Sequence, residues 1–274
     1  MNKTDILQSL EALDRDSRLT TPAPGVPAPD RKTVIGVIKD LQALLFPGYY
    51  RCERALSPAE LLTRVETRLG GEIAAALHFR GEGGDPIALT DAFLSALPTI
   101  KELLLKDIEA LYLGDPAAKC REEILLCYPG FYAISIYRMA HELYRLGVPL
   151  LPRIMTEYAH EKTGIDIHAG ATIGEYFFID HGTGIVIGET TVIGHHVKLY
   201  QGVTLGAKSF ETDENGNPVK NIKRHPNIGN HVVIYAGATI LGGSTTVGDG
   251  VTVGGNVWLT HSVEPGTTVV YREK

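Results

Sequence analysis

The chain has 274 residues, of which 44% are hydrophobic and 21% are charged, with a formal net charge of −6 at pH 7. This is the composition of a globular protein with one large domain or two modest ones, and it excludes an intrinsically disordered chain. The acidic balance argues against nucleic acid as the main partner. The sequence has no apolar run of about 18 residues and no signal peptide, and its three cysteines are widely spaced. We therefore expect a cytoplasmic protein that stays outside the membrane and lacks a disulfide framework.

Residues 1–30 contain one short amphipathic stretch followed by TTPAPGVPAPD. Proline and alanine at this density are typical of a loose linker, so we predict a flexible N-terminal tail over residues 1–30. From Arg31 to about Lys162 the apolar residues follow a helical spacing, which predicts an all-helical domain over residues 31–162.

Three signals predict helices within that domain. Residues 57–60, Ser-Pro-Ala-Glu, combine a capping serine, a proline suited to the first helical position and the glutamate of a capping box. A second helix is expected over residues 91–113. It is expected to be kinked at Pro98 and ended by Gly114. A third helical region, residues 121–146, is expected to be split at Pro129.

Past Gly164 the period changes, because an aliphatic residue followed by a small one recurs every six positions. Six is the period of a β-solenoid, in which three hexapeptides make one triangular coil of about 18 residues and each aliphatic side chain points inward. A β-sandwich with spaced glycines is the alternative, but so many aliphatic residues in register do not favour it. The inward positions are Ile167, Ile173, Ile179, Ile187, Ile193, Leu199, Leu205, Ile228, Ile234, Ile240, Val247, Val253 and Leu259.

The repeat is interrupted between Leu205 and Ile228 by a polar segment that contains the turn sequence Asn-Gly-Asn-Pro. We predict an insertion loop over residues 207–223 that projects from the solenoid. Long polar loops on rigid scaffolds often carry binding function.

Histidines beside carboxylates are the first candidates for chemistry. Asp166 and His168 flank the inward-pointing Ile167 on one short strand. His181 follows Asp180 where the six-residue spacing stretches, so the corner bulges and the histidine can be exposed. Asp166 precedes His181 by about one coil, so it could orient His181 as a general base across the stack. Adjacent Asp180 is expected to point away, and ordinary surface histidines remain the alternative.

Other motifs are less specific. The run from Lys223 to Pro226, Lys-Arg-His-Pro, closes the loop and suits an anionic group, with a solvated basic loop end as the alternative. Asp115-Pro116-Ala117 is, on local grounds, a helix terminator. The histidines lack zinc-ligand spacing, so no metal site is expected. Phosphate-binding loops and nucleophile-elbow motifs are absent from the sequence.

Several ordered motifs together resemble bacterial serine O-acetyltransferases of the hexapeptide-repeat acyltransferase superfamily. They are TGIDIHAGA from Thr163, IDHGTGIVIGET from Ile179, QGVTLG from Gln201 and KRHP from Lys223, with DPA at Asp115. The resemblance covers roughly residues 105–262. It implies an α+β arrangement, in which an all-helical N-terminal domain precedes a left-handed parallel β-helix catalytic domain over residues 163–274.

The resemblance implies transfer of an acetyl group from acetyl-CoA to the hydroxyl of L-serine, giving O-acetyl-L-serine for cysteine biosynthesis. By matching motifs, it implies His181 as the general base and Asp166 as its orienting partner. Arg224 and His225 are implied to bind the substrate carboxylate, with His225 close to the reacting centre.

The remaining implied contacts concern the ammonium group and the cosubstrate. Asp115 and Asp180 are implied to accept the ammonium of the substrate. Lys208 or Lys223 is a candidate to face the phosphates of acetyl-CoA. Small residues let the pantetheine arm approach the backbone closely. The positions that match it are Gly206, Ala207, Ala236 and Gly255.

The resemblance further implies a homotrimer through the solenoid, or a dimer of trimers, with active sites between solenoids and feedback inhibition by L-cysteine. The printed sequence ends at Lys274 without the isoleucine that inserts into O-acetylserine sulfhydrylase, so a stable complex with that enzyme is not predicted. The alternatives are an acetyltransferase for a sugar or another hydroxyl acceptor, a non-catalytic scaffold and, weakest, a zinc-dependent solenoid.

Overall fold

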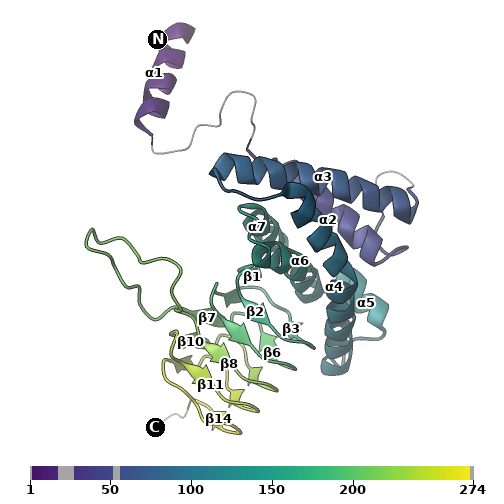
Figure 1. The fold of residues 1–274 in the computed structure, drawn as a ribbon. Coiled ribbons are helices and arrows are strands. Elements are labelled where there is room, and N and C mark those ends of the chain that lie inside the picture. Colours follow the sequence, from purple (N-terminus) through teal and green to yellow (C-terminus); the bar gives the residue numbers. More distant parts are fainter. Residues whose placement is uncertain (1, 18–27, 52–55, 272–274) are drawn as a thin grey trace.

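The computed structural model describes residues 2–17, 28–51 and 56–271, and within them seven helices precede fourteen short strands. Figure 1 shows the helices gathered at one end, the strands wound into a solenoid at the other, and one long loop projecting from the strands. The predicted fold class is confirmed, since the helical part is followed by a parallel β-solenoid of about five turns that is consistent with a left-handed β-helix. None of the helices in these ranges is long and apolar enough to cross a membrane.

Helix α1 (Lys3–Asp16) is the amphipathic stretch of the predicted tail, and it begins with a capping box between Asn2 and Asp5. Most of the proline- and alanine-rich segment, residues 18–27, lies outside the described residues. The other helices are α2 (Arg31–Leu45), α3 (Pro58–Arg80), α4 (Pro86–Gly114), α5 (Arg121–Cys127), α6 (Pro129–Arg145) and α7 (Leu151–Thr163).

Two predicted helix boundaries have different outcomes. The capping box at Ser57 is present and α3 begins at the next residue, as predicted. The second predicted start, residue 91, was wrong, because α4 begins five residues earlier at Pro86, where the Asp85 side chain accepts a hydrogen bond from the Ile87 N–H. Helix α4 also continues through Pro98, since a proline removes only one backbone hydrogen bond and the buried apolar face spans the whole helix.

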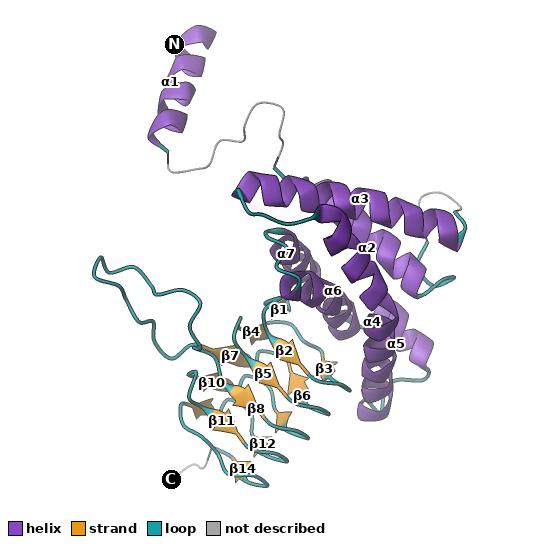
Figure 2. Cartoon of the chain, viewed as in Figure 1, coloured by secondary structure: helices purple, strands orange, loops and turns teal. Residues whose placement is uncertain are grey.

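The solenoid has three faces, each of which is a sheet of parallel strands (Figure 2). Face 1 is β1-β4-β7-β10-β13, face 2 is β2-β5-β8-β11, and face 3 is β3-β6-β9-β12-β14. All the predicted inward aliphatic side chains are buried, which confirms the six-residue period. The strands are β1 (Asp166–Ile167), β2 (Thr172–Ile173), β3 (Phe178–Asp180), β4 (Val186–Ile187), β5 (Val192–Ile193), β6 (Lys198–Tyr200), β7 (Thr204–Gly206), β8 (Asn227–Ile228), β9 (Val233–Ile234), β10 (Thr239–Leu241), β11 (Thr246–Val247), β12 (Thr252–Val253), β13 (Trp258–Leu259) and β14 (Thr268–Val269).

The coils differ in length. Asp166 lies opposite Val186, so the first coil takes 20 residues, whereas Val186 lies opposite Thr204 after 18. Thr204 in turn lies opposite Thr239, because the coil between them also contains the projecting loop that leaves after β7. Near the tip of the loop, the Asp213 carboxylate accepts two backbone N–H groups at 2.9 Å.

A buried ion pair connects the helices to the first coil. Asp107 of α4 and Arg138 of α6 are both buried, and Arg138 Nε lies 2.6 Å from Asp107 Oδ2. Arg138 also donates to the backbone carbonyls of Ile173 and Gly174, and Asp107 accepts from the Phe177 N–H at 2.9 Å. These bonds fix α4 and α6 against the first coil of the solenoid. Site residues on the helices therefore have defined positions relative to site residues on the solenoid.

Candidate active site

The predicted site residues lie on two different edges of the solenoid. Each coil passes from face 1 to face 2 to face 3 and back to face 1. His181 lies at the turn from face 3 to face 1, which we call the His181 edge. His225 lies at the turn from face 1 to face 2, which we call the His225 edge. Face 1 separates them, and an extended hexapeptide at about 3.3 Å per residue spans roughly 15–20 Å.

On the His181 edge, the imidazole is close to an unexpected carboxylate. His181 follows β3, its side chain is 70% exposed, and its Nε2 lies 3.8 Å from Asp180 Oδ1. The expectation that Asp180 points away was therefore wrong. His181 has a left-handed backbone with φ of 57°, which breaks the strand alternation and brings the two side chains together. At 3.8 Å the contact is an ion-pair distance rather than a hydrogen bond.

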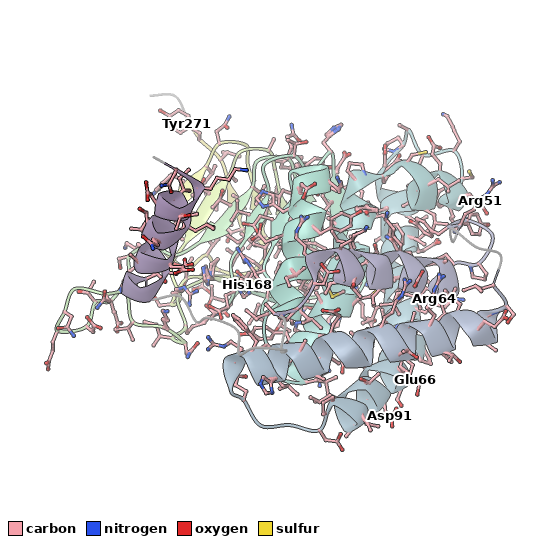
Figure 3. All side chains as sticks on the ribbon, turned by 90° about the horizontal axis from the view of Figure 1, so that it is seen from above. Arg51, Arg64, Glu66, Asp91, His168 and Tyr271 are labelled. Atoms are coloured by element: carbon pink, nitrogen blue, oxygen red, sulfur yellow. The ribbon has the colours of Figure 1, made fainter. Side chains whose placement is uncertain are left out.

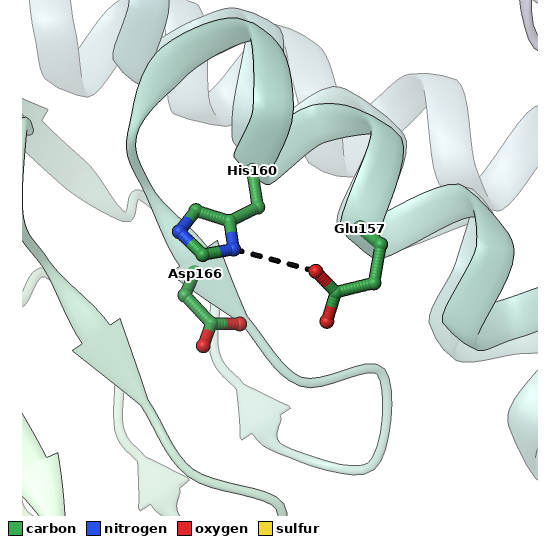
Figure 4. A group of neighbouring side chains, drawn as sticks. All are labelled: Glu157, His160 and Asp166. Carbon is green, nitrogen blue, oxygen red and sulfur yellow. Dashed lines mark hydrogen bonds and ion pairs between the residues drawn. The ribbon is translucent and has the colours of Figure 1, made fainter.

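Asp166 lies at the same edge but does not contact His181 in this structure. Because the first coil has 20 residues, Asp166 is stacked on Val186 and not on His181. Its carboxylate lies within 4.8 Å of ligand atoms of Glu157 and His160 on α7 (Figure 4). No hydrogen bond or ion pair joins Asp166 to His181 among the described side chains, so the orienting pair implied by the resemblance is not formed here.

Glu157, His160 and Asp166 also form the group with metal-ligand spacing in the described part of the chain. His160 Nδ1 is 3.4 Å from Glu157 Oε2, and all three residues are half-buried. Acidic groups commonly gather without an ion, and we assign no metal to this group.

The helices add a second carboxylate to the His181 edge. Asp115 ends α4, and its side chain accepts hydrogen bonds from the Tyr128 hydroxyl at 2.5 Å and from the Ala117 N–H at 2.8 Å. The bond from Tyr128, the bond from Ala117 and the nearby His181 lower the pKa of Asp115, which keeps it ionised. Burial, the bond to Asp115 and the charge of Asp180 raise the pKa of Tyr128, so its hydroxyl remains a donor. The His181 imidazole thus has the Asp180 carboxylate at 3.8 Å, and Asp115 lies close enough for the imidazole to influence its pKa.

Tyr128 is the site residue that the sequence reasoning missed. The Pro129-Gly130 pair after it was interpreted only as a helix break. At Gly130, an added Cβ would lie 2.5 Å from the Ile179 carbonyl oxygen, so the start of α6 approaches the strand that carries Asp180. This close approach is the signal that could have placed Tyr128 near the site, because only glycine permits it.

On the His225 edge, the imidazole is only 7% exposed. Its Nδ1 accepts the Thr190 N–H at 3.0 Å, so Nδ1 carries no proton and the neutral ring is protonated at Nε2. Burial, reinforced by the charge of Arg224, lowers the pKa of His225 to about 4. His225 is therefore a neutral N–H donor near pH 7.

Arg224 and Lys223 have different surroundings. Arg224 Nη2 lies 2.5 Å from Glu189 Oε2, and Tyr144 of α6 donates to the other Glu189 oxygen at 3.2 Å. Tyr144 also packs edge-on against His168, which is labelled among the side chains in Figure 3. Lys223 Nζ donates to the Thr190 carbonyl and to Asn227 Oδ1, which ties this side chain to the turn after β4.

The small residues predicted to line the acetyl-CoA groove divide between the same two edges. Ala236 and Gly255 are neighbours on the His181 edge, where an added Cβ at Gly255 would lie 3.2 Å from the Ala236 carbonyl oxygen. Gly206 and Ala207 lie at the end of β7, on the His225 edge. Each edge thus holds part of the predicted acceptor site and part of the predicted cosubstrate groove.

Comparison with known proteins gives a consistent result. No family model matches the chain. It is 62% identical over 266 residues to the plasmid serine acetyltransferase of Synechococcus elongatus, covering 89% of this chain and 82% of that protein. Serine acetyltransferase 1 of Entamoeba histolytica, solved in complex with L-cysteine, has a TM-score of 0.78, 38% identity and 86% coverage of both chains. The Neisseria gonorrhoeae serine acetyltransferase in complex with serine has a TM-score of 0.60 and 27% identity, covering 88% of this chain and 95% of its own. This chain belongs to the serine acetyltransferase family.

Proposed function

We propose that this protein transfers the acetyl group of acetyl-CoA to the hydroxyl of L-serine, giving O-acetyl-L-serine and CoA. The observation that carries the proposal is the chemistry of the two edges. Asp115 and Asp180 offer carboxylates beside an exposed imidazole, and Arg224 and His225 offer a cation and an N–H donor. A zwitterionic amino acid requires both an anionic and a cationic contact. L-cysteine has the same two charges, and we propose that it inhibits by binding in the same place.

His181 acts as the general base in this proposal. It removes the proton of the serine hydroxyl as that oxygen attacks the thioester carbonyl carbon. The new C–O bond forms and the negative charge moves to the carbonyl oxygen, where an N–H donor stabilises it. When the C–S bond breaks, the CoA sulfur leaves with the electron pair and takes the proton from the His181 imidazolium. Acetyl-CoA is a substrate in this proposal.

The complete site is proposed to form between two copies of the chain. The anionic contact and the base lie on one edge, the cationic contact lies on the other, and face 1 separates them within one chain. The predicted cosubstrate residues are divided in the same way, since Ala236 and Gly255 lie on the His181 edge and Gly206 and Ala207 lie on the His225 edge. In a symmetric ring, the His181 edge of each copy meets the His225 edge of the next. A homotrimer is the smallest assembly we propose, and a dimer of trimers extends it.

Mixed assemblies test this arrangement. Co-expression of a His181→Ala chain with an Arg224→Ala chain is expected to restore about a quarter of the wild-type activity, because random mixing pairs two intact edges at about one contact in four. Each variant purified alone is expected to be nearly inactive. Activity no higher than the sum of the two variants would mean that each site lies within one chain.

The function itself is tested by thiol release from acetyl-CoA with purified protein. Release is expected to require L-serine, and consumption of the acetyl-CoA thioester, which the thiol of L-cysteine does not obscure, is expected to fall with added L-cysteine. L-homoserine, a panel of sugars and a reaction without acceptor are the controls. Release that depends on a sugar would identify the protein as an acetyltransferase for sugars. No release with any acceptor from folded protein would favour a non-catalytic scaffold.

A further inference from the structure

We propose that Thr190 is a positioning residue that holds His225 as its Nε2–H tautomer, so that His225 presents a neutral N–H donor to the anionic group of the reaction. The inference rests on the proposed function, because it assigns His225 a role in acetyl transfer. It goes further by naming the residue, in the turn after β4, that determines what His225 can do.

The hydrogen bonds of the Thr190 hydroxyl determine its own orientation. Thr190 Oγ1 accepts the backbone N–H of Arg224 at 3.0 Å and that of His225 at 3.1 Å. Backbone N–H groups can only donate, so both lone pairs of the oxygen are used. The hydroxyl proton is then directed to His225 Nδ1, which lies 2.9 Å from Oγ1. Nδ1 therefore receives two donors, this hydroxyl and the Thr190 N–H, and has no place for a proton of its own.

Every polar atom of Thr190 contacts the segment that closes the insertion loop. The Thr190 carbonyl accepts Lys223 Nζ at 2.5 Å, while its amide and hydroxyl bind Arg224 and His225. This residue thus connects the base of the loop to the coil. The imidazole packs closely against Gly188, where an added Cβ would overlap the ring, so the ring has little room to turn.

A histidine elsewhere in the chain has the opposite arrangement. His141 Nδ1 lies 2.7 Å from the Ala169 carbonyl oxygen, which can only accept, so His141 carries its proton on Nδ1. The tautomer is therefore set separately at each histidine by its neighbours. At His225 the neighbours select the Nε2–H form, and Nε2 has no hydrogen bond to any described residue.

The selected tautomer separates the roles of the two site histidines. With Nδ1 occupied, His225 cannot take the hydroxyl proton, which leaves that task to His181. An uncharged donor beside Arg224 also avoids placing a second positive charge next to the guanidinium. His225 Nε2–H can then bind the substrate carboxylate or the oxyanion of the tetrahedral intermediate.

The test compares three variants of the full chain. Thr190→Val keeps the shape and the backbone N–H but removes the hydroxyl, and we expect kcat/KM for L-serine to fall about 10–100-fold, as for loss of a hydrogen bond that leaves polar partners unpaired. Thr190→Ser restores the hydroxyl and is expected to stay within about threefold of wild type. Thr191→Val is the matched control, because the adjacent Thr191 hydroxyl is buried and has no hydrogen-bond partner among the described residues.

A spectroscopic measurement separates this proposal from the proposed function. Solid-state ¹⁵N spectra of histidine-labelled protein, with His225→Gln to identify the signal, are expected to show His225 protonated only at Nε2. In Thr190→Val, His225 is expected to titrate at a higher pH than in wild type. A proton on Nδ1 in wild type, or full activity of Thr190→Val, would overturn the inference. Absence of L-serine-dependent activity in wild type would instead overturn the proposed function, and the spectra would still decide the tautomer.

Discussion

Replacing His181 with alanine is expected to lower kcat for acetyl transfer by about 10²–10⁴-fold, the usual contribution of a general base. The side chain is 70% exposed, so its removal leaves no cavity and the thermal stability should stay close to that of wild type. Thiol release at saturating L-serine and acetyl-CoA measures the change. His78→Ala, at an exposed histidine of α3, is the control and should keep full activity. A His181→Ala protein with more than a tenth of the wild-type kcat would exclude it as the base.

Asp166 and Asp180, both proposed to act with His181, should have separable effects. Asp166 can orient His181 only after its carboxylate turns away from His160 and Glu157. If it does so during the reaction, Asp166→Asn lowers kcat and leaves KM for L-serine nearly unchanged. Asp180→Asn, at the proposed ammonium contact, raises KM for L-serine instead. The opposite split would make Asp180, 3.8 Å from the imidazole, the orienting carboxylate.

Replacing Asp107 with alanine is expected to lower the free energy of unfolding by about 3–5 kcal/mol, because it leaves the buried Arg138 guanidinium without its carboxylate. The Phe177 N–H would lose its acceptor as well. Urea unfolding followed by circular dichroism measures the effect. The ion pair joins α4 and α6 to the first coil, which carries His181. Loss of the pair should therefore also reduce activity.

A surface ion pair provides the comparison for Asp107. Arg121 and Glu109 form a two-bond pair of similar length, with Nε and Nη2 at 2.6 and 2.8 Å, but the two side chains are 51% and 33% exposed. Glu109→Ala is therefore expected to cost no more than about 1 kcal/mol. Equal losses for Asp107→Ala and Glu109→Ala would show that burial adds nothing to the junction pair.

The sequence by itself determined the architecture, because the signals for it are local and repeated. An inward aliphatic residue at every sixth position predicts a solenoid without any knowledge of long-range contacts, since each coil repeats the same pattern. The capping box at Ser57 predicts the start of α3 for the same reason, as all its atoms lie within four residues. The motifs around His181 and His225 also identified the family that the comparisons support.

Only the tertiary structure decided how the site residues pair. The length of the first coil stacks Asp166 on Val186, and the left-handed backbone of His181 brings Asp180 close. Tyr128 reaches Asp115, and Thr190 reaches His225, through hydrogen bonds between residues that are distant in sequence. A six-residue period sets which side chains point inward, but it does not specify the lengths of the turns. Those lengths determine which polar side chains meet at each edge. The order of the three faces then places His181 and His225 on different edges.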